Sequence, residues 1–147
     1  MTTHPTLPLD RPELVVITCG SRKLDHRALA GELYTGGYHR ACRRAAEALA
    51  PDRLLILSSA YGLLALDDVV DPYDTSVDAP TAITAAQLID QASARGLLQL
   101  DPVVVFAGAG HVRLVRAVWP HAVSPLSGVG GMGKQIAFLN AIAERPS

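Results

Sequence analysis

The stretch Leu14–Lys23, LVVITCGSRK, decides the fold. It opens with five β-branched or aliphatic residues in a row, a pattern typical of a strand that is buried on both faces inside a parallel sheet. A thiol, a glycine, a hydroxyl and two cationic side chains follow at residues 19–23. Because ligands of open α/β sheets bind beyond the carboxyl ends of the strands, this turn is the first candidate for a binding site.

Similar apolar runs recur along the chain, and helical patterns alternate with them. Further strands are predicted over residues 53–57, 103–107 and 122–126, and helices over 38–50, 84–98, 111–119 and 134–143. This alternation predicts a single-domain α/β fold with a mostly parallel central sheet of about four strands and helices on both faces. All four strands are expected to run in the same direction. Residues 67–80 are polar and rich in proline, and they are predicted to form a long irregular excursion.

Length and charge narrow the function classes. The 147 residues suit one domain, predicted over residues 13–147, behind a mobile tail at 1–12. A net charge of −1 argues against non-specific binding of nucleic acid through a global basic field. Any contact with DNA would have to be local, and the cluster of Arg40, Arg43 and Arg44 on a predicted helix is either such a patch or a solvated face.

The cysteines and the apolar runs bear on location and cofactors. Cys19 and Cys42 have neither the spacing of metal ligands nor that of a disulfide framework, so we expect no metal and no cofactor. The apolar runs are too short for a signal peptide or a membrane span. A cytoplasmic protein without a membrane partner is therefore expected, and a homodimer stays open as an alternative.

The ends of the four predicted strands would gather polar turns at one edge of the sheet. These turns cover residues 19–23, 58–62, 108–111 and 127–133, and each contains glycine, which lets the backbone approach a ligand closely. We therefore expect a ligand site there. The residues expected to bind the substrate from these turns are Cys19, Gly20, Ser21, Arg22, Lys23, Ser59, Tyr61, Gly62, His111, Gly130, Gly131 and Lys134.

Three of these residues have alternative interpretations. Lys23 either forms a Schiff base or binds a phosphate, and the second is favoured because the sequence indicates no burial around it. Cys19 is either a nucleophile with a lowered pKa or a small buried residue at a strand end. The second is favoured, since no Cys-His-Asp spacing supports the first. His111 is either a general acid, a hydrogen-bond donor to substrate or a surface histidine without a function.

The glycine-rich segment 128–135 matches the pattern G-x-x-x-x-G-K of nucleotide triphosphatases only in part. Gln135 stands where those proteins have the Ser or Thr that binds magnesium, which argues against such an enzyme. Gly130, Gly131 and Lys134 still suit a helix start that offers amide groups to a phosphate or carboxylate. The alternative is a flexible turn that only caps the last helix.

The candidate catalytic residues are Asp71 and Asp74, in the sequence Asp-Pro-Tyr-Asp of the excursion. A loop of this kind can fold over a site and present a carboxylate that orients water or stabilises an oxocarbenium-like charge on a sugar. The alternative is a surface loop that uses Asp and Pro as turn formers.

Four motifs together resemble a known family: V-I-T-C-G-S-R-K, A-x-E-L-Y-T-G-G-Y, L-I-L-S-S-A-Y-G-L-L and D-P-Y-D. The chain is similar to a small bacterial family of uncharacterised domains related to the peroxide-stress protein YaaA. The resemblance covers residues 15–74 and adds Tyr34 to the expected binding residues. It implies a more distant relationship to the uracil-DNA glycosylase superfamily and to a domain of archaeosine synthase, whose members handle nucleobases.

These observations predict a domain that recognises a nucleobase or nucleotide and hydrolyses an N-glycosidic bond. Ser21, Arg22 and Lys23 would hold phosphate or the polar edges of the base, Tyr61 would stack on it, and Asp74 or Asp71 would activate water. The expected ligand is a nucleoside, a nucleotide or a base within a nucleic acid. The alternatives are a non-catalytic DNA-binding protein of oxidative stress and a biosynthetic enzyme with a small-molecule substrate.

Overall fold

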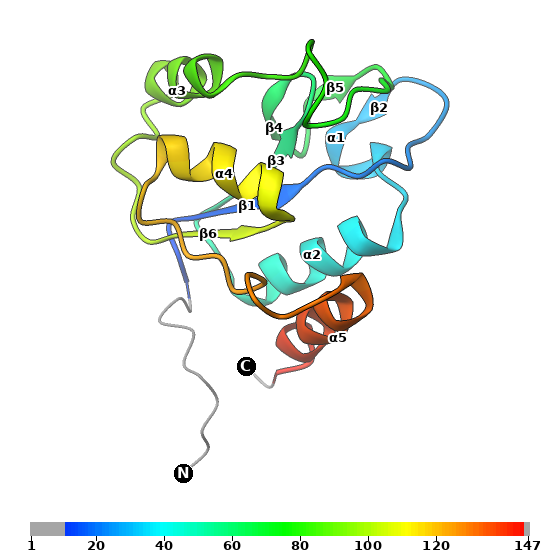
Figure 1. Cartoon of the computed structure of the whole chain (residues 1–147), viewed down its shortest axis with the longest axis vertical. Coiled ribbons are helices and arrows are strands. Elements are labelled where there is room, and N and C mark those ends of the chain that lie inside the picture. The colour runs from blue at the N-terminus through cyan, green and yellow to red at the C-terminus, as the bar shows by residue number, and fades with distance from the viewer. Residues whose placement is uncertain (1–10, 146–147) are drawn as a thin grey trace.

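A four-stranded sheet forms the centre of the computed structural model, which describes residues 11–145 (Figure 1). Its strands, in spatial order, are β4 (Gly62–Ala65), β3 (Arg53–Ser58), β1 (Leu14–Thr18) and β6 (Val103–Phe106). β1 pairs in parallel with β3 on one side and with β6 on the other, and β4 is antiparallel to β3. The single-domain, mostly parallel α/β fold is confirmed.

Helices cover both faces of this sheet, as the sequence predicts (Figure 1). The helices α2 (Gly37–Ala48) and α5 (Met132–Ala143) pack on one face, and α3 (Ala85–Ala94) and α4 (Ala109–Val118) on the other. The side chains of residues 14–17 in β1 alternate between the two cores and are completely buried. This explains why these four positions are all apolar.

The fourth strand of the sheet is not the one predicted. The chain does not pass from β3 into a helix but turns at residues 59–61 and returns as β4, antiparallel to β3. The predicted strands β1, β3 and β6 run in the same direction, as expected. Leu63 and Leu64 still fit a buried strand, because each faces one of the two cores.

The strand predicted over residues 122–126 does not form, so this prediction is wrong. Only Val123 pairs with the sheet, through a parallel bridge to Val104 of β6. Pro125 follows two residues later and has no amide hydrogen to continue a ladder. The chain instead turns through residues 124–129 toward α5.

Two long connections contain short elements that the sequence did not predict. β2 (Ala28–Leu29) and α1 (Ala30–Leu33) lie between β1 and α2, and β5 (Val69–Val70) lies in the excursion after β4. β2 and β5 form a small antiparallel sheet. The rest of the excursion, residues 71–80, has no helix or strand, in agreement with the predicted irregular segment.

Helix starts differ in a way that bears on the site. Thr84 caps α3 with a full capping box that includes Gln87. The helices α2, α4 and α5 begin instead after Gly36, Gly108 and Gly131, none of which can offer a side-chain cap. Their first amide groups are therefore available to other partners.

The predicted tail at residues 1–12 lies outside the described residues as far as residue 10. Arg11 and Pro12 are held by backbone hydrogen bonds to Leu49 and Asp52. Among residues 11–145, none of the helices combines the length and the apolar character needed to cross a lipid bilayer.

Candidate active site

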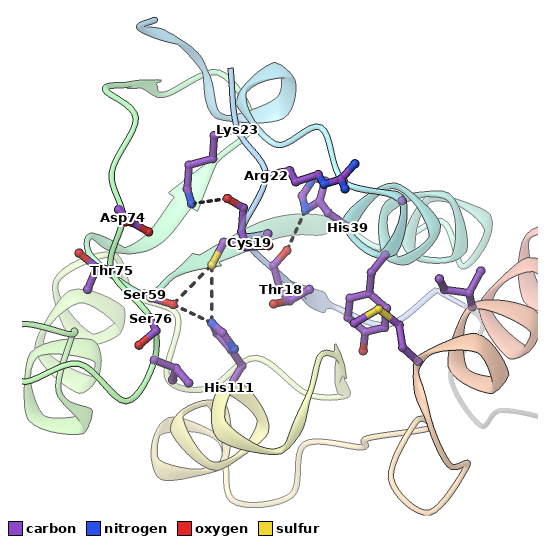
Figure 2. Close-up of a pocket in the computed structure, with 18 residues that line it drawn as sticks. Thr18, Cys19, Arg22, Lys23, His39, Ser59, Asp74, Thr75, Ser76 and His111 are labelled. Carbon is purple, nitrogen blue, oxygen red and sulfur yellow. Dashed lines mark hydrogen bonds between the residues drawn. The ribbon is translucent and has the colours of Figure 1, made fainter. Parts of the chain in front are cut away.

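A cavity of about 600 Å³ opens at the carboxyl edge of the sheet. Its walls come from residues 18–23 after β1, residues 36–39 at the start of α2 and residues 74–77 of the excursion, together with Ser59, His111 and the start of α5. Figure 2 shows how these side chains surround the space. The location agrees with the expected ligand site beyond the strand ends.

The floor of the cavity carries a thiol, a hydroxyl and an imidazole in mutual contact (Figure 2). Cys19 follows the central strand β1, Ser59 follows its neighbour β3, and His111 lies in the first turn of α4, which follows its other neighbour β6. The Nε2 atom of His111 lies 3.6 Å from Cys19 Sγ and 3.1 Å from Ser59 Oγ. Cys19 Sγ and Ser59 Oγ are 3.5 Å apart.

The surroundings of Cys19 favour its thiolate form. Burial opposes ionisation, but the hydrogen bond and charge of His111 and the Ser59 hydroxyl outweigh it and lower the pKa of Cys19 to about 7. Cys42 is the contrast within the same chain. It is completely buried in α2, and burial raises the pKa of its thiol to about 12.

The expectation that Cys19 acts only as a packing residue is therefore incomplete. Its side chain is 7% exposed and belongs to the core, as expected, but it also lines the cavity and contacts an ionisable base. Sequence spacing could not indicate this contact, because 92 residues separate Cys19 from His111.

His39 is a further titratable group of this cavity that the sequence did not single out. Its Nδ1 donates to the backbone carbonyl of Thr18 at 2.8 Å, which leaves its buried Nε2 as an acceptor without a hydrogen-bond partner. Burial lowers the pKa of His39 and keeps the ring neutral. A signal for this residue was present in the T-G-G-Y motif directly before it.

Two cations belong to the cavity wall, at Arg22 and Lys23. The Lys23 ammonium lies 4.4 Å from the centre of the Tyr73 ring, within the range of a cation–π contact. Tyr73 in turn hydrogen-bonds through its hydroxyl to Tyr34, and its ring meets Tyr61 edge to face. This tyrosine cluster connects the excursion to the segment that carries Lys23.

Three helix starts border the cavity. Gly36 and Gly37 at the start of α2, His111 in the first turn of α4 and Met132 at the start of α5 all line it. Uncapped amide groups and the positive ends of helix dipoles favour anions. Together with the two cations, they make this space suitable for a phosphate or carboxylate group.

The two candidate aspartates have different positions. Asp74 lies at the cavity mouth with Thr75, Ser76 and Val77. Asp71 lies outside the cavity lining, where it accepts two hydrogen bonds from Arg27, at 2.9 and 3.1 Å. The bonds to Arg27 lower the pKa of Asp71. Asp71 thus fastens the start of the excursion, and of the two only Asp74 can face a ligand in this cavity.

The cavity brings together eight of the predicted site residues. They are Cys19, Gly20, Ser21, Arg22, Lys23, Ser59, Asp74 and His111. Within residues 11–145, the lining does not include the remaining seven predictions. These are Asp71, Tyr34, Tyr61, Gly62, Gly130, Gly131 and Lys134.

Local structure explains two of these exceptions. Gly62 has φ +81° and a Cβ there would overlap the Gln91 side chain, so this glycine serves the turn between β3 and β4. In the glycine-rich turn, Gln135 donates to the Gly130 carbonyl at 2.9 Å and accepts from the Tyr38 hydroxyl at 2.6 Å. Gln135 thus ties this turn to α2, and α5 reaches the cavity through Met132 and Ile136 instead.

No group of three or more His, Cys, Asp or Glu side chains within residues 11–145 is arranged to hold a metal ion. No curated protein and no solved structure matches the chain. A family model matches residues 14–141, which include the sheet, all of its helices except the last two residues of α5, and every segment that lines the cavity. By this match the chain belongs to DUF6884, a family of unknown function.

Proposed function

We propose that this protein binds a nucleoside or nucleotide in the cavity beyond the sheet and hydrolyses its N-glycosidic bond. One observation carries the proposal: a single cavity is lined by two cations, three uncapped helix starts and the carboxylate of Asp74. Its volume of about 600 Å³ lies within the range of small-molecule sites. The resemblance to proteins that handle nucleobases supports the same substrate class, and we propose a distant relationship to them.

The cationic part of the cavity would hold the anionic end of the ligand. Arg22 offers a planar set of donors that matches a phosphate, and Lys23 adds a second positive charge to the lining of the same cavity. The amide groups at the start of α2 would complete this subsite, because Gly36 and Gly37 leave the backbone open to the ligand.

Asp74 would act on the bond that breaks. As the base leaves, positive charge develops on the sugar ring, and a nearby carboxylate stabilises it and takes a proton from the attacking water. Asp71 is not proposed for this role because Arg27 already occupies both of its carboxylate oxygens.

The alternative of DNA binding has less support from the described side chains. Arg43 donates to the Gly31 carbonyl and lies 3.6 Å from Glu47, and Arg44 donates to Asn140 at 2.9 Å. Two of the three arginines proposed as a DNA patch therefore already have protein partners. A biosynthetic role on another small molecule would use the same cavity, and a homodimer stays a prediction.

The free thiols suggest where the protein works. Cys19 is most reactive as an unmodified thiolate, and reducing compartments keep thiols in that state. We therefore propose a cytoplasmic location.

The test is a search for released base. Purified protein is incubated with nucleosides, nucleoside monophosphates and oligonucleotides that contain modified bases, and free base is measured by chromatography. Asp74→Asn should lower the rate at least about 100-fold, a usual effect of losing a general base. Asp78→Asn is the matched control, because Asp78 lies in the same excursion but outside the cavity lining. No base from any substrate, or equal rates in the two variants, would overturn the proposal.

A further inference from the structure

We propose that Cys19 is a nucleophile that bonds transiently to the sugar carbon of the ligand, with His111 as its proton partner. The geometry behind this inference is the contact of Sγ with an imidazole nitrogen at 3.6 Å on the floor of a cavity of ligand size. The role toward the sugar rests on the proposed function. The nucleophilic character of the thiol can be measured without any substrate.

The sheet fixes the two partners independently of the ligand. The Cys19 amide donates to the Leu57 carbonyl at 3.1 Å, which extends the pairing of β1 with β3 by one residue. His111 is carried by α4, whose buried valines belong to the same core as Leu14 and Val16 of β1. Both groups are thus held by regular structure, as a nucleophile and its base need to be.

Ser59 contacts both the Cys19 thiol and the His111 imidazole. Ser59 is 2% exposed, and its hydroxyl lies within reach of both the sulfur and the imidazole. As a donor to the thiolate it favours the charged form. The Ser59 hydroxyl also lies 3.1 Å from His111 Nε2, the same ring nitrogen that contacts the thiol.

Several other charged and titratable groups lie near the thiol and can affect the pH dependence of its reactivity. Lys23, Arg22 and Asp74 line the same cavity from the β1 turn and the excursion, and His39 lines it from α2. Tyr34 and Tyr73 lie close enough that a negative charge on Cys19 helps to raise their own pKa values. Neither tyrosine ionises near pH 7, so His111 is the partner to test.

The first covalent step would transfer the sugar to the protein. The thiolate electron pair forms a bond from Sγ to the sugar C1′, and the electrons of the C1′–N bond leave with the base. The leaving nitrogen takes the proton of the His111 imidazolium. The products of this step are a thioglycoside on Cys19, a neutral imidazole and the free base.

The second step would return the protein to its starting state. Asp74 takes a proton from water as the oxygen attacks C1′, and the electrons of the C1′–Sγ bond return to sulfur. The proton passes from Asp74 through solvent to His111, which restores the thiolate and imidazolium. No oxidant, reductant or metal takes part, and the sum of the two steps is hydrolysis of the N-glycosidic bond.

Alkylation kinetics test the nucleophile directly. Wild-type protein is treated with iodoacetamide between pH 5.5 and 10, and modification of each cysteine is followed by peptide mass spectrometry. The sulfur displaces iodide, so the rate follows the thiolate fraction. We expect Cys19 to react with a midpoint near its lowered pKa of about 7, and Cys42 to serve as the unreactive internal control.

His111→Asn separates a proton partner from a merely structural contact. Without the imidazole, the midpoint of Cys19 should rise above about 8, and the rate at pH 7 should fall at least about fivefold. Cys42→Ala is the matched control and should keep the wild-type midpoint. A wild-type midpoint near 8.5, the usual value of a free thiol, or an unchanged midpoint in His111→Asn would overturn the assignment.

Trapping tests the step at the sugar. With a substrate from which the wild type releases base, acid-quenched Asp74→Asn should carry a mass increase of one sugar unit on Cys19, because the second step is slowed. Cys19→Ser and Cys19→Ala should each lose base release at least about 100-fold, with folding checked by circular dichroism. Base release that persists in both folded variants would overturn the covalent step alone. No base from wild type would overturn it together with the proposed function, while the alkylation midpoint would still decide the nature of the thiol.

Discussion

Cys19 and Cys42 are buried thiols with opposite pKa shifts, and the difference is one of hydrogen-bond partners. Both lose contact with water, which disfavours the thiolate. Cys42 has the Tyr38 hydroxyl as a partner, which does not outweigh this loss, whereas Cys19 has the His111 imidazole in addition to the Ser59 hydroxyl. The consequence at the scale of single residues is that the two thiols should contribute to stability in opposite directions as pH rises.

The stability of the wild type relative to Cys19→Ser should depend on pH. The pKa of Cys19 falls from 9.0 to about 7 on folding, so the folded state gains stability relative to the unfolded state as pH rises from about 7 to 9. The gain is at most about 3 kcal/mol, from a shift of two units. It is lost again as pH falls through 7. Urea unfolding at pH 6.5, 8 and 9.5 under reducing conditions measures the difference, in which the contribution of Cys42 cancels. A difference that does not change with pH would contradict the expectation.

His39 makes a prediction of the same sign as Cys19, but in the acid range. Because burial lowers its pKa, the unfolded chain takes up a proton below pH 6.5 more readily than the folded protein does. Unfolding free energy should therefore fall as pH drops below about 6.5. His39→Asn can still donate to the Thr18 carbonyl but cannot titrate, so its stability should decline less over the same range. Urea midpoints at pH 7, 6 and 5 test this, and parallel curves for both proteins would exclude His39 as the cause.

At the scale of elements, one side chain of α3 joins that helix to the turn between β3 and β4. Gln91 donates to the Tyr61 carbonyl and accepts from the Leu63 amide, both at 2.9 Å. It thereby connects the turn at residues 59–61 to α3. The same side chain occupies the space beside Gly62, whose φ is +81°.

Gly62→Ala should therefore destabilise the protein. The new methyl group would meet Gln91 Oε1 at 2.2 Å, and a residue with a Cβ is strained at this φ. We expect a loss of about 2–4 kcal/mol in unfolding free energy, measured by urea unfolding. Gly133→Ala is the control, since nothing lies within 4 Å of its Cβ position and α5 is helical there. It should be neutral or raise stability by up to about 1 kcal/mol.

The same hairpin shows how far the sequence predicts this fold. The apolar runs of β1, β3 and β6 were sufficient for three strands of the sheet and for their parallel direction. Leu63 and Leu64 are too few to stand out from the end of β3, so the return strand was not predicted. Val123 is a residue type that favours strands, but Pro125, two residues later, limits the pairing to one bridge.

The sequence predicted the edge of the sheet at which the candidate site lies, but not the hydrogen bonds between its side chains. Strand direction alone brought Cys19, Ser59 and His111 to one end of the sheet, as expected. Their hydrogen bonds depend on the order of the strands, which places β1 between β3 and β6 and which no local pattern encodes. For the same reason the sequence could not show which of Asp71 and Asp74 faces the cavity. The answer depends on Arg27, in a distant loop, which binds Asp71.

At the scale of the whole molecule, the site combines a segment within the central sheet with a segment that has no regular secondary structure. β1 is paired on both sides and buried along its whole length, so its amides should exchange with solvent only when the molecule unfolds globally. Residues 71–77 have no helix or strand and are anchored mainly by side chains.

Hydrogen exchange followed by mass spectrometry should reveal this difference. Peptides that cover residues 14–19 should exchange at least about 1000-fold more slowly than peptides that cover 71–77, because local opening needs less free energy than global unfolding. Arg27→Gln should accelerate exchange in residues 71–77 and leave β1 unchanged, since it removes the ion pair with Asp71 alone. Equal exchange in the two segments would show that the excursion is as firmly held as the sheet.

The anchoring of the excursion also has an evolutionary consequence. Asp74, Thr75, Ser76 and Val77 contribute a wall of the cavity without taking part in the central sheet. Substitutions of Thr75, Ser76 and Val77 can reshape the cavity mouth at little cost to folding, provided that Asp71 and Tyr73 keep their partners. Asp74 should stay unchanged, because we propose it as the base. Differences in ligand preference within the family should accordingly be found at residues 75–77 before they are found in the strands.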